Sequence, residues 1–99
     1  MFLDSYQILD TLREKKKDLR GLGVRRIALI GSFAKGEQTE QSDLDFLVEF
    51  ENKSFENFMD LIFFLEDLFG RDVDLLTSES LREKVRAHVL EEAVYVPGL

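Results

Sequence analysis

Apolar positions recur with a helical period in two long stretches of the chain. Between residues 4 and 20, apolar side chains fall on one face of a helix, with Asp4 placed to cap its start and Gly21 to end it. The stretch 54–70 begins with a serine, carries a dense apolar stripe and closes on a glycine. Both stretches predict helices that bury one face against another layer of the fold.

Three short apolar runs, rich in β-branched and aromatic residues, predict buried strands at residues 24–30, 44–50 and 71–77. A short helical turn is expected directly after the first strand. A last helix is expected over residues 80–94, opened by a capping box from Ser80 to Glu83. Because helices and strands alternate, we expect an α/β (α+β) fold with a small mixed sheet flanked by helices.

The composition adds size, charge and compartment to this picture. A chain of 99 residues has room for one domain, residues 1–99, and no apolar run reaches the roughly 20 residues of a membrane span. The formal net charge of -7 argues against nucleic acid as a direct ligand, because that affinity depends on basic residues. The lack of cysteine and of a basic signal segment favours the cytoplasm.

Basic residues are concentrated between residues 13 and 26. Such a run on a helix is typical of a solvated face. The alternative is a docking patch for an acidic partner.

Two aspartates, Asp43 and Asp45, stand one residue apart at the strand expected over 44–50. Side chains two positions apart on a strand share a face, with Cα atoms about 6.5 to 7 Å apart, so both carboxylates can reach one cation. Like charges held this close repel, and a fold that keeps both ionised usually supplies a cation. Mg²⁺ is the cation that suits carboxylates beside a phosphate.

A turn suited to phosphate precedes these aspartates. Gly31 and Ser32 directly follow the first predicted strand, and the short helix expected there has free backbone N–H groups that can bind phosphate oxygens. Gly31 lets a phosphate approach the backbone, and Ser32 can donate a hydrogen bond to it. Lys35 can reach the phosphate as well; the alternative is that it is a solvated turn residue. A P-loop is excluded, because Glu37 stands where that motif needs its lysine.

A third carboxylate would complete a site for two metal ions, which suits in-line phosphoryl transfer. The strand expected over 71–77 offers Asp72 and Asp74, which share a face by the same period of two. The pattern alone therefore does not choose between them. Because Arg71 flanks Asp72 and favours a surface position there, we select Asp74, deeper in the apolar run.

These motifs resemble the polymerase-β-type nucleotidyltransferase superfamily, in which a Gly-Ser step, ten residues and Asp-x-Asp precede a strand with a further aspartate. The short chain is similar to the minimal nucleotidyltransferase (MNT) branch, often the antitoxin half of a two-protein toxin–antitoxin pair. The specific part of the resemblance is GSFAKGEQTEQSDLDFLVEF; RDVDLLT supports it, and the ending LEEAVYV also resembles the branch.

The resemblance implies a fold, an activity and a role for each motif residue. The fold would be that of polymerase-β-type nucleotidyltransferases, and the activity would be Mg²⁺-dependent transfer of AMP from ATP to a protein hydroxyl. In such antitoxins the acceptor is a tyrosine of a HEPN-type toxin partner. Gly31 and Ser32 would contact the nucleotide phosphates. The metal ions would be held by Asp43, Asp45 and Asp74, and Asp74 would also act as the base.

Two alternatives from other classes fit the same sequence. The chain can be a binding module, an antitoxin that neutralises its partner by complex formation while its acidic site is inactive. It can also be a small-molecule nucleotidyltransferase, which the lack of a separate acceptor domain disfavours. A covalent role for Ser32 is disfavoured too, because the only histidine, His88, lies in the last predicted helix.

The helix expected over 54–70 has more apolar surface than one face needs. One stripe is enough to cover a sheet, and it consists of Phe55, Phe58, Met59, Ile62, Leu65 and Phe69. The apolar residues left over are Leu61, Phe63, Phe64 and Leu68. Either the first and last helices cover them, or they bind a partner or a second copy of the chain, giving a homo-oligomer through residues 55–69.

Overall fold

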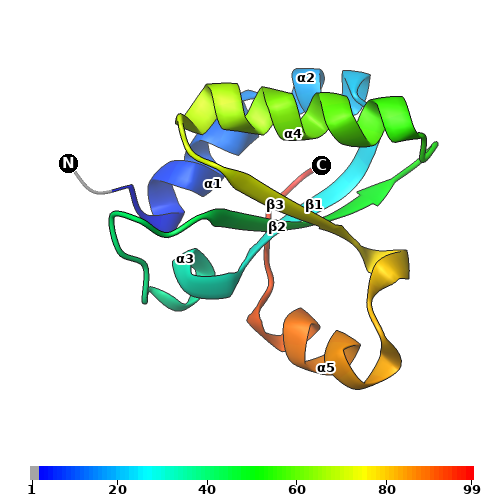
Figure 1. The fold of residues 1–99 in the computed structure, drawn as a ribbon. Coiled ribbons are helices and arrows are strands. Elements are labelled where there is room, and N and C mark those ends of the chain that lie inside the picture. Colours follow the sequence, from blue (N-terminus) through cyan, green and yellow to red (C-terminus); the bar gives the residue numbers. More distant parts are fainter. Residues whose placement is uncertain (1–2) are drawn as a thin grey trace.

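A computed structural model describes residues 3–99 of the chain and confirms the expected α/β class with a mixed sheet (Figure 1). The elements in order are α1 (Ser5–Glu14), α2 (Lys16–Gly21), β1 (Val24–Ile30), α3 (Gly31–Lys35), β2 (Leu44–Phe50), α4 (Phe55–Phe69), β3 (Val73–Thr77), the 3-10 helix η1 (Ser78–Ser80), α5 (Glu83–Glu92) and β4 (Val94–Tyr95). Within the described residues, none of these helices is long and apolar enough to cross a membrane.

The four strands form one sheet in the order β3-β2-β1-β4. β1 is antiparallel to both β2 and β4, whereas β2 and β3 run parallel. The parallel pair is joined by α4, the kind of crossover that parallel strands need. Its register pairs Asp45 with Asp74, so two candidate site residues lie side by side on neighbouring strands.

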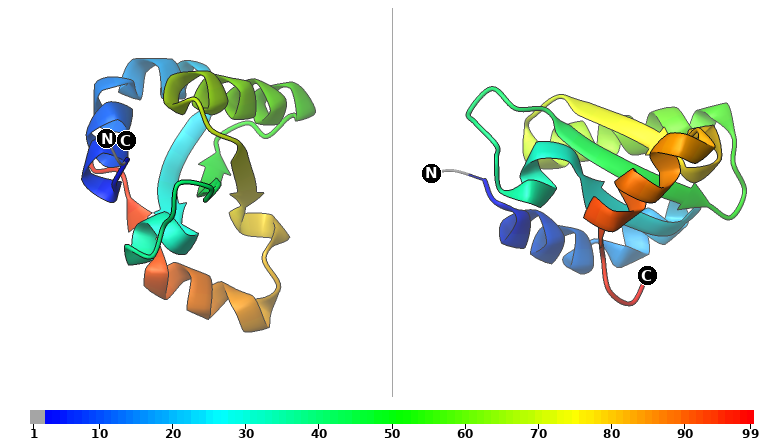
Figure 2. Two further views of the ribbon diagram at one scale, coloured as in Figure 1. Left: turned by 60° about the vertical axis from the view of Figure 1, so that its left-hand side comes forward. Right: turned by 90° about the horizontal axis from the view of Figure 1, so that it is seen from below.

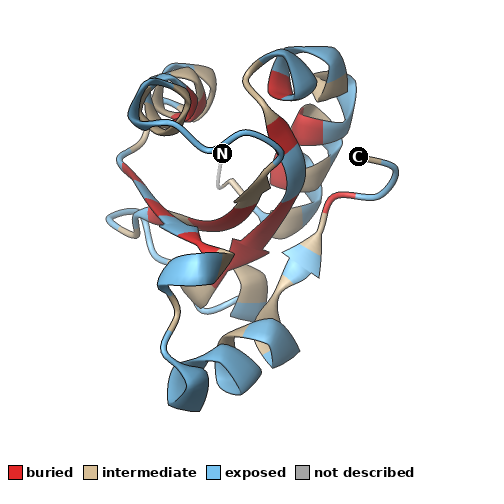
Figure 3. Cartoon of the chain, turned by 90° about the vertical axis from the view of Figure 1, so that its right-hand side faces the viewer, coloured by how far each residue is buried: buried red, intermediate tan, exposed pale blue. Residues whose placement is uncertain are grey.

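The main core lies between one face of the sheet and the helices α1, α2 and α4 (Figures 1 and 2). Buried positions concentrate in the strands and on the inner sides of these helices (Figure 3). The fully buried side chains include Ile8, Leu12, Leu19, Phe46, Leu61 and Leu65. On the opposite face, the described residues form a small buried cluster of Ala28, Ile30 and Leu47, against which Val89 of α5 packs together with Leu81, Ala93 and Tyr95. One face of the sheet is therefore deeply covered and the other thinly.

The helix expected over residues 4–20 is divided into α1 and α2, which meet at Lys15. The Lys15 amide donates to the carbonyl of Leu12 as α1 ends. The cause lies in the sequence between Leu12 and Leu19, which is entirely charged. Because no apolar side chain of this run enters the core, packing does not hold a straight helix against the sheet there.

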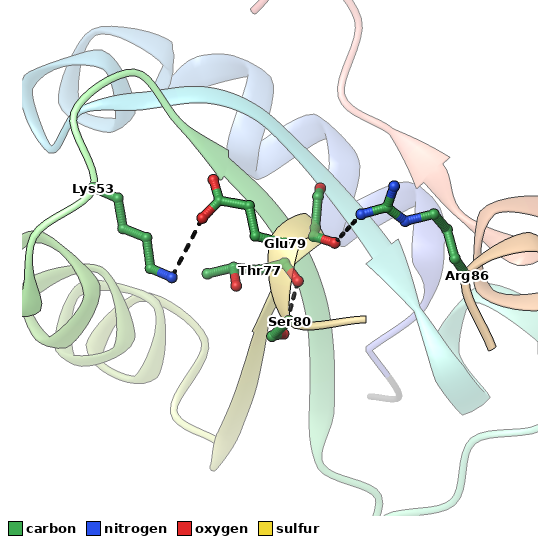
Figure 4. A network of polar contacts seen from close by, with 6 residues as sticks. Lys53, Thr77, Glu79, Ser80 and Arg86 are labelled. Carbon is green, nitrogen blue, oxygen red and sulfur yellow. Dashed lines mark hydrogen bonds and ion pairs between the residues drawn. The ribbon is translucent and has the colours of Figure 1, made fainter. Parts of the chain in front are cut away.

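The capping box expected from Ser80 to Glu83 does not form. Figure 4 shows the contacts that Ser80 and Arg86 make in its place. The Ser80 hydroxyl donates instead to the carbonyl of Thr77 at 2.8 Å, and Arg86 donates to the carbonyl of Ser78 at 2.7 Å. The last helix therefore begins only at Glu83. It ends at β4, a strand that the sequence pattern did not predict, because two residues are too few for a period of two to be recognised.

α4 buries a different stripe from the one expected. Leu61 is fully buried, and Phe64 and Leu68 pack against the core. Phe55, which was assigned to the buried stripe, is 79% exposed. Of the four residues predicted to be surplus, only Phe63 is largely exposed, at 59%. The apolar surface that α4 leaves uncovered is therefore Phe55 and Phe63.

Truncating the buried and the exposed apolar residues of α4 should have very different effects. Leu61→Ala is expected to lower the free energy of unfolding by about 2–5 kcal/mol, since it leaves a cavity in the core. Phe63→Ala should lower it by less than about 1 kcal/mol, because the ring is already mostly in water. Urea unfolding followed by circular dichroism measures both. A loss for Phe63→Ala as large as that for Leu61→Ala would contradict the exposed position of Phe63.

Candidate active site

The candidate aspartates lie on the thinly covered face of the sheet. In β2, Asp45 stands between two residues of the main core, so its side chain points to the opposite face. Asp74 occupies the equivalent place in β3 and is exposed. Asp43 lies two positions before Asp45, just outside the strand, and is also exposed. The fold therefore places Asp45 beside Asp74, with Asp43 close enough for its charge to act on Asp45.

The surroundings of Asp45 change its acidity. The pKa of Asp45 is raised from 3.8 to about 6. Burial is the largest cause, followed by the charge of Asp74, a hydrogen bond with the Asp74 side chain, and the charge of Asp43. Below about pH 6, the Asp45 carboxyl therefore keeps its proton and shares a hydrogen bond with Asp74.

The donor set fits Mg²⁺, which binds carboxylate oxygens together with substrate phosphates. Across residues 3–99, however, no group of three or more histidine, aspartate or glutamate side chains is already arranged to hold a metal ion. A cation bound there would favour the ionised form of Asp45, and its charge would offset the burial and the neighbouring negative charges that raise the pKa of that carboxyl group.

Gly31 is in contact with Asp45. Its φ of 74° lies in the left-handed region that favours glycine, and a Cβ added there would overlap the Asp45 carboxylate. The sequence motif predicts that this glycine makes room for a phosphate. The structure shows a second reason for a glycine, because the Asp45 carboxylate lies against its Cα. The turn expected to hold phosphate and the carboxylates expected to hold metal are thus adjacent.

Ser32 and Lys35 differ in their freedom to reach a ligand. Ser32 is half-buried in the first turn of α3, whose N-cap residue, Ile30, makes no side-chain bond to the helix amides. The Lys35 Nζ lies 3.1 Å from Oε1 of Glu92, an oxygen that is also 3.3 Å from Nε2 of His88. Lys35 would have to exchange this partly exposed ion pair for a phosphate, an exchange that costs little. The sequence did not indicate the pair, because its members are far apart in the chain.

Asp72 is placed differently from Asp74. It precedes β3, and its carbonyl accepts a hydrogen bond of 3.0 Å from the amide of Leu44. Its side chain lines a shallow polar hollow of about 420 Å³ together with Asp43. It is not among the groups that raise the pKa of Asp45. The register of β2 and β3 therefore supports Asp74 as the third carboxylate.

Comparison with known proteins gives the family. The nucleotidyltransferase domain family matches residues 6–96 of the chain. A Methanocaldococcus jannaschii protein named as a protein adenylyltransferase is 42% identical to this chain over 95 residues. The match covers 91% of this chain and 95% of the relative. Protein adenylyltransferase MntA of Thermococcus cleftensis is 44% identical over 92 residues, covering 91% of this chain and 93% of the relative.

Solved structures agree with this assignment. A chain assigned as a minimal nucleotidyltransferase is similar with a TM-score of 0.73 and 35% identity, over 93% of this chain and 95% of that one. A chain from the complex of a tri-AMPylated Shewanella oneidensis HEPN toxin with an MNT antitoxin has a TM-score of 0.64 at 20% identity, over 92% of this chain and 73% of that one, and shows the shared fold alone.

Fold and comparisons together define an enzyme that transfers nucleotidyl groups. The chain belongs to the nucleotidyltransferase domain family, in the minimal branch of the polymerase-β-type superfamily. The family resemblance drawn from the Gly-Ser and Asp-x-Asp motifs is thereby confirmed.

Removing the Asp45 carboxylate should stabilise the metal-free protein above about pH 6. A carboxyl group whose pKa rises on folding contributes stability that is fully present below pH 3.8 and is lost as the pH rises through about 6. Asp45→Asn is neutral at every pH, so its melting temperature relative to wild type should rise between pH 4 and pH 7. Thermal unfolding in metal-free buffer measures this difference. Asp72→Asn is the control, and an equal trend for both variants would contradict the cluster.

Alanine at Gly31 should disturb the site beyond its effect on the backbone. Gly36 provides the matched control, because its φ of 73° is similar but no atom lies within 4 Å of an added Cβ. Both substitutions should cost about 1–2 kcal/mol for the left-handed conformation. Gly31→Ala should cost more and shift the titration of Asp45, measured by urea unfolding and carboxyl-carbon NMR. Equal costs with an unchanged Asp45 titration would contradict the contact.

Proposed function

We propose that this chain transfers AMP from ATP, with Mg²⁺, to a tyrosine hydroxyl of a HEPN-type toxin partner, and so acts as a cytoplasmic antitoxin. The observation that carries the proposal is that Gly31 touches Asp45 and that Asp45 pairs with Asp74. A triphosphate held at the Gly31–Ser32 turn would lie beside the carboxylates that hold its metal. The relatives named as protein adenylyltransferases support AMP as the group transferred, and the complex with the AMPylated HEPN toxin supports the class of partner.

Each part of the site has a separate task in binding. The first amides of α3 and the Ser32 hydroxyl would donate hydrogen bonds to the phosphate oxygens of ATP. Asp43, Asp45 and Asp74 would hold Mg²⁺ through their carboxylate oxygens. Bound there, the metal neutralises charge on the triphosphate and polarises the α-phosphorus. Lys35 would add a positive charge to the phosphates once it leaves Glu92.

The transfer step needs a base and an accessible acceptor position. The acceptor oxygen attacks the α-phosphorus, the bond from that phosphorus to the oxygen bridging to the β-phosphate breaks, and pyrophosphate leaves. Asp74 would accept the proton of the hydroxyl. Asp74 suits this role because it is exposed and β3 is an edge strand, so a protein can approach it from outside the sheet.

The acceptor must be held by contacts outside the chemical site, because orientation of the hydroxyl supplies a large part of the rate. Phe55 and Phe63 are the large apolar side chains that α4 exposes. They would contact the partner or a second copy of the chain, as expected for the 55–69 helix. Membranes play no part in this proposal, and nucleic acid is not its direct ligand.

Incubation with ATP labelled at the α-phosphate, Mg²⁺ and a HEPN partner should label the partner on tyrosine, located by mass spectrometry. Asp74→Asn should slow transfer by about 10²- to 10⁴-fold, as expected when a general base is lost. Asp72→Asn is the matched control and should change the rate little. A wild-type protein that forms the complex without labelling it is the binding module instead, and equal losses for both variants would leave the role of Asp74 unsupported.

A further inference from the structure

Arg71 contacts two segments that border the nucleotide site. Its Nη1 donates to the carbonyls of Glu40 and Ser42, each at 3.1 Å, and its guanidinium carbon lies 5.3 Å from the ring centre of Phe33. A terminal guanidinium nitrogen carries two N–H groups, one for each of these carbonyls. The side chain is half-buried, so these contacts are partly shielded from water.

Asp43 needs such support more than the other carboxylates do. Asp45 and Asp74 lie inside paired strands, where the backbone ladder fixes them. Asp43 lies outside β2, which begins at Leu44. The bond from Arg71 to the Ser42 carbonyl fixes the peptide group that directly precedes Asp43.

The loop of residues 36–43, which ends at Asp43, has few anchors of its own. Most of its residues are exposed. Thr39 and Ser42 close a tight turn, in which the Thr39 amide donates to the Ser42 hydroxyl at 2.8 Å and the Ser42 amide donates back to the Thr39 carbonyl at 3.1 Å. This turn shapes the loop internally. Gln38 donates to the carbonyl of Leu3 at 3.4 Å, and the two bonds from Arg71 attach the end of the loop to the segment that precedes β3.

Phe33 connects the same guanidinium to the phosphate turn. It follows Ser32 in α3 and is only 1% exposed, so its ring is a fixed surface. The flat guanidinium group can lie over this ring and bond two carbonyls at once. A lysine keeps the charge but has no plane to place on the ring, so the contact favours arginine.

We propose that Arg71 is a positioning residue of the nucleotide site, which holds Asp43 and the Gly31–Ser32 turn in one arrangement before metal and phosphate bind. The inference rests on the proposed function, because it assigns Asp43 to the metal. Without Arg71 the loop must be ordered when the ligand binds, and that ordering reduces affinity.

The test compares Arg71→Gln and Arg71→Lys with Arg20→Gln in the full chain. Arg20 is a matched control, because its Nη2 also donates to a backbone carbonyl, that of Gly98, at 2.9 Å. The probe is Mg²⁺ with α,β-methylene ATP, whose α–β link cannot be cleaved, titrated by calorimetry. Arg71→Gln should bind about tenfold more weakly, Arg71→Lys at least about threefold more weakly, and Arg20→Gln like wild type.

A second readout follows the loop without any ligand. Amide hydrogen exchange of residues 40–44 should be faster by about tenfold in Arg71→Gln and unchanged in Arg20→Gln. Urea unfolding establishes that each variant is folded under the conditions of titration. Should Arg71→Gln fail to fold, Arg71→Lys carries the comparison.

The outcomes separate this inference from the function on which it rests. A folded Arg71 variant that binds the probe with wild-type affinity overturns the positioning role. This holds even if the variant is less stable, because lower stability with unchanged affinity is what a purely structural role of Arg71 predicts. A wild-type chain that does not bind the probe overturns the proposed function, and the inference with it. Weaker binding together with faster exchange, confined to the Arg71 variants, supports the positioning role.

Discussion

The parallel pairing of β2 with β3 brings the carboxyl groups of Asp45 and Asp74 side by side, and the rest of the site depends on this contact. Two like charges would move apart if the backbone allowed it. It does not, because residues on either side of each aspartate are packed in the main core on the opposite face. The burial of apolar side chains therefore holds the two carboxyl groups together, and burial of Asp45 together with the nearby charge of Asp74 raises the pKa of Asp45.

The unequal covering of the two sheet faces gives a small chain room for a site. A single domain of this size needs most of its apolar surface for one core, and α1, α2 and α4 complete that core on one face alone. The other face is left with three buried residues, and α5, which packs there, contributes no buried residue of its own. This face is open to solvent and carries the aspartates. A polar ligand requires both, whereas the apolar core on the other face offers neither.

The sequence predicted those features that have a local cause. Asp4 and Ser54 cap their helices, and Gly70 ends α4 in the left-handed conformation. The expected capping box at Ser80 shows the limit of such signals. Its hydroxyl donates to the carbonyl of Thr77 instead, because Ser80 lies in η1 and not at the start of α5.

The features that the sequence did not predict depend on the approach of distant segments. The contact of Gly31 with Asp45, the ion pair of Lys35 and the two bonds of Arg71 join residues from different elements, and no periodicity marks them. The orientation of α4 belongs to the same class. With ten apolar residues among fifteen, several faces of that helix are apolar enough to be buried, and only packing against the sheet selects one.

The contact between Gly31 and Asp45 makes the two halves of the site interdependent. A cation that ionises Asp45 changes the charge directly beside the turn, and an anion bound at the turn changes the charge that Asp45 experiences. If the proposed cation and phosphate bind there, each would alter the free energy of binding the other, and by thermodynamic linkage the two effects would be equal. A site divided between separate domains would need a motion to achieve this coupling. Here it follows from the absence of one Cβ atom at Gly31 and from the register of two strands.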